Sequence, residues 1–173
     1  MGFLRGGGLA NLDSVNLRGI WIVFIALIIQ ILIFPLFSEH AIVTVGTSYL
    51  HLFSYLLLAV FVVINIKVWE LSLMGVGMLL NFLVIALNHG YMPTSVTSLQ
   101  GAGQQAIADC LLNSGTYGNV IKMTSSTVLN FFGDWLYLPS FFPMSSAFSL
   151  GDLLISVGLI AFFGLEMVED SKT

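Results

Sequence analysis

Four long apolar stretches dominate the pattern of hydrophobic and polar positions along this chain. They cover residues 20–37, 48–66, 70–88 and 150–168, and the first contains no charged residue. About 20 apolar residues in a helix cross the hydrocarbon of a bilayer, where each backbone polar group is satisfied within the helix. A soluble core of 173 residues has no room to bury all four stretches. The pattern therefore predicts four transmembrane helices and an all-α membrane protein.

The connections between these stretches predict how the helices pack. Residues 38–47 join the first two stretches, and only residues 67–69 separate the second from the third. Short connections make neighbouring helices run antiparallel. Residues 89–149 form one long insertion before the last helix. We therefore predict a single integral membrane domain over residues 1–173, an antiparallel four-helix bundle with a long, ordered outer loop.

The few basic residues predict the orientation. If the spans alternate, four of the five bases lie on one side of the membrane: Arg5, Arg18, Lys67 and Lys172. Lys122 lies on the other side. Because Lys and Arg accumulate on the cytoplasmic side, we expect both termini in the cytoplasm and residues 89–149 on the outer side of the membrane.

Composition narrows the class of protein further. The chain is 57% hydrophobic and 8% charged, with a formal net charge of −4. Nucleic-acid binding needs clustered Lys and Arg, so no nucleic-acid partner is expected. The single cysteine, Cys110, excludes an intramolecular disulfide and a multi-cysteine metal site. No phosphate-binding loop, dinucleotide fingerprint or histidine pair for haem is present, so we predict no cofactor.

The long outer segment has an unusual composition for a loop. Residues 91–149 carry only three charged side chains, Asp109, Lys122 and Asp134. Disordered segments need low hydrophobicity and high charge, so this composition predicts an ordered loop. Its many Ser, Thr and Gly residues argue against a further span.

Aromatic residues gather in the second half of this segment. They are Phe131, Phe132, Trp135, Tyr137, Phe141 and Phe142, interrupted by Pro139 and Pro143. Such rings settle in the headgroup zone of a membrane. The run predicts either an interfacial anchor that holds the loop on the outer leaflet or the lip of a cleft that opens to lipid.

Polar side chains in the predicted spans need an explanation, because amide and ionisable groups are costly in hydrocarbon. Asn81 and Asn88 are seven residues apart and share one face of the third span. His51 lies near the outer end of the second span, and we predict a polar outer-leaflet cluster of His51, Asn88 and Asn119. Interhelical hydrogen bonding is the simplest role for such residues. A lone histidine predicts no metal site.

Two acidic residues are candidates for chemistry. Asp134 and Asp152 both fall at the predicted outer boundary of the membrane. Two carboxylates there can share a proton, one activating water and the other remaining a neutral acid, as in aspartic peptidases. Structural roles are the alternative. Residues 149–152 (Ser-Leu-Gly-Asp) form a helix capping box, and Asp134 fits a turn.

Three short motifs carry a resemblance to a known family. They are residues 88–93 (Asn-His-Gly-Tyr-Met-Pro), 132–134 (Phe-Gly-Asp) and 148–152 (Phe-Ser-Leu-Gly-Asp). Over nearly its whole length the chain resembles an uncharacterised family of small bacterial multi-pass membrane proteins, one of the groups labelled domains of unknown function. The resemblance implies membership and a bacterial membrane, but no activity.

The last third also resembles, in part, the lipoprotein signal peptidase. That family carries Gly-Asn-x-x-Asp-Arg, then an acidic Asp-Phe region, then Phe-Asn-x-Ala-Asp at the start of its final helix. This chain has residues 118–122 (Gly-Asn-Val-Ile-Lys), 133–135 (Gly-Asp-Trp) and 148–152. The resemblance implies four spans, cytoplasmic termini and an aspartic site at the outer leaflet.

This chain departs from the peptidase pattern at important positions. Lys122 stands where the first catalytic aspartate belongs, Met123 replaces the arginine, and Ser149 replaces the asparagine. A lysine cannot share a proton with a carboxylate as a second acid does. The resemblance then implies either a relative that lost peptidase activity or one that uses Asp134 with Asp152.

Two functions follow from these observations. The first is a non-enzymatic accessory or scaffold subunit of the bacterial cytoplasmic membrane, whose outer loop contacts lipid or another membrane protein. The alternative is an aspartic intramembrane hydrolase acting at the outer leaflet through Asp134 and Asp152. A small transporter is less favoured, because no internal repeat is visible and only Asn81 is placed near the middle of a span.

Overall fold

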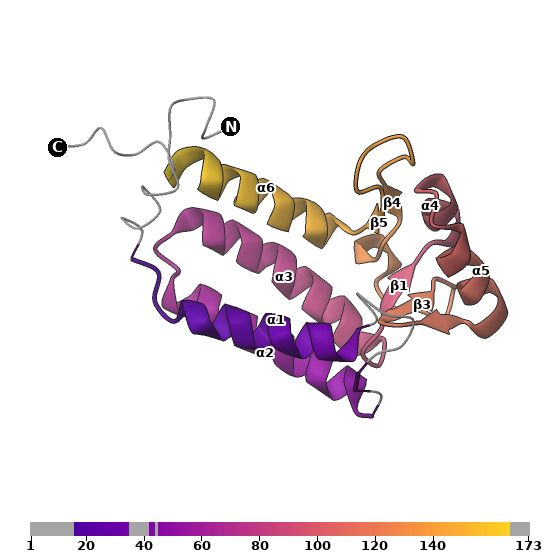
Figure 1. Cartoon of the computed structure of the whole chain (residues 1–173), viewed down its shortest axis with the longest axis horizontal. Helices are drawn as coiled ribbons and strands as arrows, with labels where there is room; N and C mark the ends of the chain where they lie inside the picture. The colour runs from indigo at the N-terminus through magenta and orange to yellow at the C-terminus, as the bar shows by residue number, and fades with distance from the viewer. Residues whose placement is uncertain (1–15, 35–41, 44, 167–173) are drawn as a thin grey trace.

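The computed structural model describes residues 16–34, 42–43 and 45–166, and it is mostly helical (Figure 1). Its α-helices are α1 (Ile20–Ile33), α2 (Thr47–Ile64), α3 (Trp69–Leu87), α4 (Val96–Gly101), α5 (Gln105–Ser114) and α6 (Leu150–Glu166). Between α3 and α6 lie the strands β1 (Met92–Thr94), β2 (Thr116–Tyr117), β3 (Val120–Lys122), β4 (Leu136–Tyr137) and β5 (Ala147–Phe148), and the 3-10 helix η3 (Asn130–Phe132).

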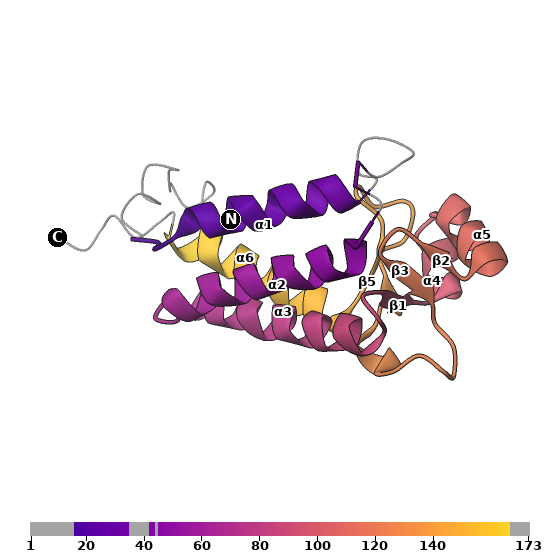
Figure 2. The ribbon, with the colours of Figure 1, turned by 90° about the horizontal axis from the view of Figure 1, so that it is seen from below.

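Four helices run alongside one another and form what we call the helical layer: α1, α2, α3 and α6 (Figures 1 and 2). α1 packs against α2, α2 against α3, and α3 against α6, the last contact being the most extensive. α2 and α3 are long and apolar enough to cross a membrane, whereas α1 is a shorter apolar helix. Residues 35–37 and 167–168 of the predicted first and fourth spans lie outside the described residues.

Glycine residues explain the close approach of α3 and α6. A side chain at Gly77 would collide with the backbone carbonyl of Gly151, and one at Gly158 would meet the first turns of α3. Without these side chains the two backbones come into direct contact, as they do in tightly packed helix pairs of membrane proteins. Gly75 faces the other way, toward Val62 of α2.

Hydrogen bonds close the end of the helical layer that lies away from the strands. The Asn65 side chain accepts a hydrogen bond from the backbone N–H of Arg18 and donates one to the Arg18 carbonyl, both at 2.8 Å. Ile22, Phe61 and Leu71 form a buried cluster that joins three helices. The turn between α2 and α3 is therefore fixed to the start of α1.

The head, which we define as residues 92–148, covers the other end of the helical layer (Figure 1). In it β1 pairs with β3 in parallel, β2 pairs with β3 antiparallel, and β4 pairs with β5 antiparallel. Leu99, Ala108 and Leu111 form a buried core at α4 and α5. The expectation of an all-α protein is wrong here, because strands of two or three residues leave no alternating pattern in a sequence.

Asn88 joins the head to the end of α3. Its amide N–H groups donate to the carbonyls of Val84 (2.7 Å) and Val128 (2.9 Å), and its Oδ1 accepts from the N–H of Val128 (2.8 Å). Ile85 and Met92 pack with Val84 in a buried cluster at this junction. One side chain thus holds the segment before η3 against the helix end.

Candidate functional site

A cluster of polar side chains lies where the helical layer meets the head. Asp152 occupies the first turn of α6, and Asn81 of α3 donates its side-chain N–H to Asp152 Oδ1 at 2.8 Å. The N–H of Ser149 donates to Asp152 Oδ2, and the N–H of Asp152 donates to Ser149 Oγ, both at 3.0 Å. These reciprocal bonds confirm the predicted capping box.

A glycine makes this contact between α3 and α6 possible. Any side chain at Gly151 would collide with the side chain of Asn81. The hydroxyl of Ser149 lies 2.9 Å from both Asn81 Oδ1 and Asp152 Oδ2. Asn81 and Ser149 are buried. A buried polar network whose members are bonded to one another fixes a single arrangement of the two helices.

Asp134 approaches the same region from the head. A Cβ at Gly133 would lie 2.5 Å from the carbonyl oxygen of Pro93, so only glycine lets this segment pair beside β1. The N–H of Asp134 donates to that carbonyl, and the hydroxyl of Thr94 donates to Asp134 Oδ2, both at 2.9 Å. Asp134 Oδ1 is buried and has no hydrogen-bond partner among the described residues.

The surroundings of Asp134 change its acidity. Burial and, after it, the negative charge of Asp152 raise the pKa of Asp134 to about 7, while the hydrogen bond from Thr94 opposes the rise. The two carboxyl groups therefore interact electrostatically. At neutral pH Asp134 is divided between its acid and carboxylate forms, which suits a group that transfers a proton or binds a hydrogen-bond donor.

The two acids nevertheless line different hollows. Asp152 lines a hollow of about 410 Å³ between α6 and the β4–β5 hairpin. Asp134 lines a smaller hollow of about 180 Å³ inside the head. Ala147 of β5 lines both. The two carboxyl groups thus interact electrostatically but line separate hollows.

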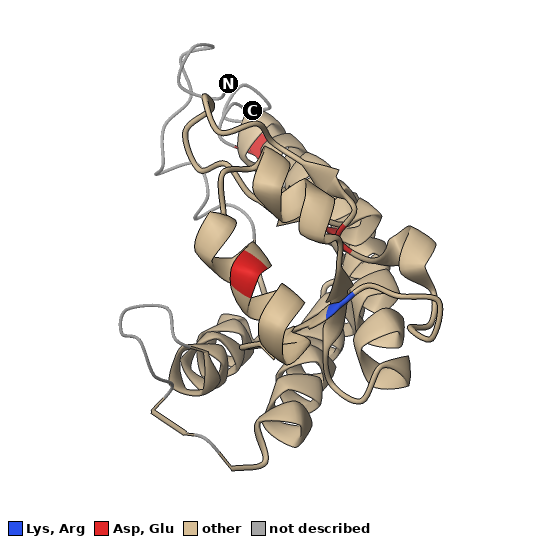
Figure 3. Ribbon diagram, turned by 90° about the vertical axis from the view of Figure 1, so that its right-hand side faces the viewer, with Lys and Arg blue, Asp and Glu red and all other residues tan. Residues whose placement is uncertain are grey.

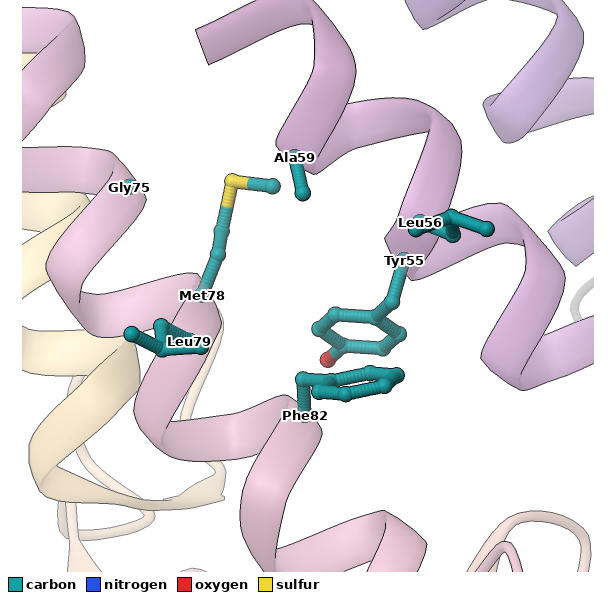
Figure 4. A pocket seen from close by; sticks show the side chains of 7 residues that line it. All are labelled: Tyr55, Leu56, Ala59, Gly75, Met78, Leu79 and Phe82. Atoms are coloured by element: carbon teal, nitrogen blue, oxygen red, sulfur yellow. The ribbon is translucent and has the colours of Figure 1, made fainter. Parts of the chain in front are cut away.

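A third hollow lies between α2 and α3 and has a volume of about 240 Å³ (Figure 4). Gly75 and Ala59 leave it open, and the rings of Tyr55 and Phe82 lie together at one end, with centroids 6.3 Å apart. Tyr55 and the charge of Asp152 interact electrostatically. This apolar hollow therefore ends beside the polar cluster.

The three residues predicted to form a polar outer-leaflet cluster lie in different surroundings. His51 Nδ1 lies 3.3 Å from the carbonyl oxygen of Gly90, and its ring packs against Phe34 and Tyr55. Asn88 holds the segment before η3, as described above. Asn119 lies between β2 and β3, where it lines the hollow of Asp134. The three residues therefore have different surroundings.

The predicted interface residues lie on the head. Phe131 stacks on Trp135 with ring centroids 6.0 Å apart, and Trp135 Nε1 donates to the carbonyl of Phe131 at 2.7 Å. Phe132 instead packs against the buried cluster at the end of α3. Phe131, Trp135 and Tyr137 are exposed, although one face of the Tyr137 ring covers Gly101. Phe131 and Trp135 thus form an exposed surface, whereas Phe132 packs against the end of α3.

Charged groups are sparse in both parts of the molecule (Figure 3). The part of the chain that the structure describes contains no group of three or more His, Cys, Asp or Glu residues that could hold a metal ion. Lys122 pairs with Thr94 in the β1–β3 register. Lys122 stands where the peptidase pattern has its first aspartate. It therefore lies beside Thr94, the residue that donates a hydrogen bond to Asp134.

Comparison with known families places the chain among its relatives. The model of a family of unknown function, DUF5317, matches residues 14–164. The chain belongs to this family. No curated protein and no solved structure matches it. Membership of DUF5317 confirms the resemblance to a domain-of-unknown-function family and assigns no activity to the cluster.

Sequence reasoning found part of the site in this DUF5317 chain. The two acids and the capping serine carried recognisable signals, but Thr94 did not, because a single threonine after a proline is unremarkable. Asn81 was placed on the face it shares with Asn88, yet its partner Asp152 lies 71 positions away in the chain. Such a pairing depends on how α3 and α6 pack, which the sequence alone does not reveal.

Proposed function

We propose that this protein is an integral membrane protein of the bacterial cytoplasmic membrane that acts as a non-enzymatic accessory or scaffold subunit. In this proposal the helical layer provides four spans and the head lies on the outer leaflet, where it contacts lipid or another membrane protein. The observation that carries the proposal is the apolar surface of all four helices. Large hydrophobic side chains point outward from each, including Trp21, Val63, Leu79 and Ile160.

The positions of the bases support the proposed orientation. Arg18 and Lys67 lie at the end of the helical layer that is away from the head, and Lys122 lies on the head. By the positive-inside rule this arrangement favours a head that faces outward. The exposed rings of Phe131, Trp135 and Phe141 are then suited to the headgroup zone.

The bonding of Asp152 favours a structural role over a catalytic one. Both of its carboxylate oxygens accept hydrogen bonds, from Asn81 and from Ser149. It also lines a different hollow from Asp134. A scaffold needs only this packing, whereas a hydrolase needs both acids to face one substrate.

The only cysteine offers a direct test of the topology. Cys110 is exposed on α5 of the head. We expect a membrane-impermeant maleimide to label Cys110 in intact cells. As a control, Ile66→Cys in a Cys110→Ser background puts the thiol in the exposed α2–α3 turn, which should be labelled only after lysis. Labelling of Ile66→Cys in intact cells, or labelling of Cys110 only after lysis, would contradict the proposed arrangement.

Complementation separates the scaffold from an enzyme. We expect Asp134→Asn and Asp152→Asn to restore the phenotype of a deletion strain as the wild type does, and Gly77→Leu to fail because α3 and α6 cannot pack. Protein in the membrane fraction must be measured for each variant. If either carboxamide variant is stably inserted but fails to complement, the scaffold proposal is wrong.

A second candidate function is an aspartic hydrolase acting at the outer leaflet, either active or as a diverged relative. The observation that favours it is the unpartnered oxygen of Asp134 together with the influence of Asp152 on its acidity. This candidate predicts that a peptide carrying a hydroxyethylene transition-state mimic binds the wild type and not Asp134→Asn. Equal binding by both proteins would exclude it.

A further inference from the structure

The hollow between α2 and α3 is lined mainly by apolar side chains (Figure 4). Among the described residues that line it, only Tyr55 has a hydroxyl, amide or charged side-chain group, and its ring lies at one end beside that of Phe82. A space of about 240 Å³ with such walls offers water too few hydrogen-bond partners. Apolar cavities of this kind stay dry and take up apolar molecules. The lining therefore selects a hydrocarbon ligand.

Two small residues leave this space between the helices. Ala59 of α2 and Gly75 of α3 are too short to fill it, and the flexible side chain of Met78 reaches toward Ala59 (Figure 4). At one end Gly75 lies against α2, because a Cβ there would come within 2.5 Å of the Val62 side chain. At the other end the two rings lie together. The helices thus touch at both ends of the hollow and are apart between them.

The dimensions of the hollow suit a narrow, flexible ligand. Its lining on α3 extends from Gly75 to Phe82, seven positions, which span about 10 Å along a helix. The contact between α2 and α3 is less extensive than that between α1 and α2 or between α3 and α6. A single hydrocarbon chain lying between the helices would supply the contacts that these small side chains do not make.

The place of the hollow along the helices identifies where such a chain comes from. The lining residues lie within 55–59 of α2 and 75–82 of α3, near the middle of each helix. Two of them, Leu56 and Leu79, are exposed, so the hollow opens at the surface of the helical layer. If α2 and α3 cross a bilayer, this opening lies at mid-depth, where the surroundings are acyl chains and the headgroups are about 15 Å away.

We propose that the hollow between α2 and α3 binds one acyl chain of a membrane lipid. The chain enters sideways past Leu56 and Leu79 and packs against Ala59, Gly75 and the ring of Phe82. Because the headgroup stays outside, the site recognises the chain and not the headgroup. The inference rests on the membrane topology proposed above, and it adds a lipid held between two spans to the lipid that surrounds the helical layer.

Photo-cross-linking in nanodiscs tests the site. The discs contain phosphatidylcholine with a diazirine at the end of one acyl chain, and mass spectrometry locates the adducts. We expect adducts on Tyr55 and Met78. Ala59→Phe fills the hollow and should reduce these adducts by about fivefold or more, because the ring takes the space of the chain. Val60→Phe adds a ring at an exposed neighbouring position that does not line the hollow and should leave them unchanged.

The wild type gives a comparison that needs no variant. A second phosphatidylcholine, with the diazirine beside the ester group, carries its reactive group near the headgroup. It should label Tyr55 and Met78 less than the first probe does, because the hollow lies at mid-depth. Equal labelling of these residues by both probes, or equal labelling in the wild type and Ala59→Phe, overturns the proposal. Ala59→Leu replaces Ala59→Phe if the larger side chain prevents insertion.

An exposed residue on another helix separates failure of the site from failure of the topology. Leu27 is exposed on α1, and the chain-end probe should label it in the wild type and in every variant. Adducts on Leu27 without adducts on Tyr55 or Met78 overturn the acyl-chain site and leave the membrane topology standing. The absence of adducts from all three residues contradicts the topology and, with it, this proposal.

A second copy of the chain is the competing occupant of the hollow. Leu79→Cys in a Cys110→Ser background places a thiol at the opening of the hollow. We expect this variant to remain monomeric when the membranes are oxidised. A disulfide-linked dimer, together with the absence of lipid adducts on Met78, would assign the hollow to a protein contact and overturn the proposal.

Discussion

The helical layer and the head are held together in different ways. In the helical layer long helices pack through glycines, and their outer faces carry large apolar side chains. In the head, strands of two or three residues pair across long distances in the chain, and several side chains bond to backbone groups. The layer is held by close packing of its helices and presents an apolar surface, whereas the head is held by specific hydrogen bonds.

This difference explains why the polar cluster lies between the two parts. Asn81 and Asp152 belong to the helical layer, and Thr94 and Asp134 belong to the head. Each pair is made within its own part, and the charge of Asp152 on Asp134 links the two pairs. Substitutions in the helical layer should therefore lower the free energy of unfolding through lost packing, and substitutions in the head through lost hydrogen bonds.

The largest effect is expected from filling the α3–α6 contact. Gly77→Leu forces a side chain into the backbone of Gly151, and overpacking of this kind costs about 3 kcal/mol or prevents stable insertion. Gly164→Leu on α6 is the matched control, because a Cβ at Gly164 meets nothing within 4 Å. Unfolding by SDS in mixed micelles measures both variants. Equal stability of the two would show that the helical layer does not depend on this contact.

Removing the carboxylate of Asp152 should have the next largest effect. Asp152→Ala loses the bond from Asn81 and half of the capping box, which together contribute about 2 kcal/mol. Asp109→Ala on the exposed α5 loses only a bond from Gln105 and should cost less than about 0.5 kcal/mol. The same unfolding assay compares them. A cost for Asp152→Ala no larger than for Asp109→Ala would contradict the role assigned to the network.

A smaller effect is expected from pH. The pKa of Asp134 is about 7 in the folded protein against an ordinary value of 3.8, so the folded state holds this proton more tightly than the unfolded state does. The free energy of unfolding therefore falls as the pH rises from about 6 to about 8, by about 1 kcal/mol. Asp134→Asn should lose this dependence. A wild-type stability that rises over the same range would contradict the burial of Asp134.

The smallest effect is expected at the exposed rings of the head. Phe141 is 79% exposed, so Phe141→Ser should change the free energy of unfolding in detergent by less than about 0.5 kcal/mol. Phe162 is 8% exposed on α6, and Phe162→Ser should cost about 3 kcal/mol or more. If the two variants are equally destabilised, the ring of Phe141 packs against the molecule instead of facing its surroundings.

The sequence predicted the helical layer better than the head for a physical reason. Apolar runs of about 20 residues leave a signal that needs no knowledge of partners, and the starts of α2, α3 and α6 lie within one residue of the predicted starts. The pairing of β1 with β3 involves three residues on each side, separated by more than 20 positions. Nothing local in either segment specifies that partner.

The candidate site was predictable only where its residues act locally. Ser149 and Asp152 are three positions apart, and their capping box was visible in the sequence. Asp134 was recognisable as an acid at a boundary, but its partner Thr94 comes from a strand 40 positions earlier. The acidity of Asp134 depends on burial and on a charge in another helix, neither of which a linear pattern contains.

The bond between Asn81 and Asp152 has a consequence for biosynthesis. The ribosome completes α3 long before α6, so Asn81 has no partner until the head, which lies between the two helices in the sequence, has been synthesised. When α6 packs against α3, the hydrogen bond from Asn81 to Asp152 joins this later helix to the earlier ones. A polypeptide cut in the exposed β4–β5 connection should consequently still assemble from its two fragments. Asn81 is then in one fragment and Asp152 in the other, and the two side chains can still bond to each other.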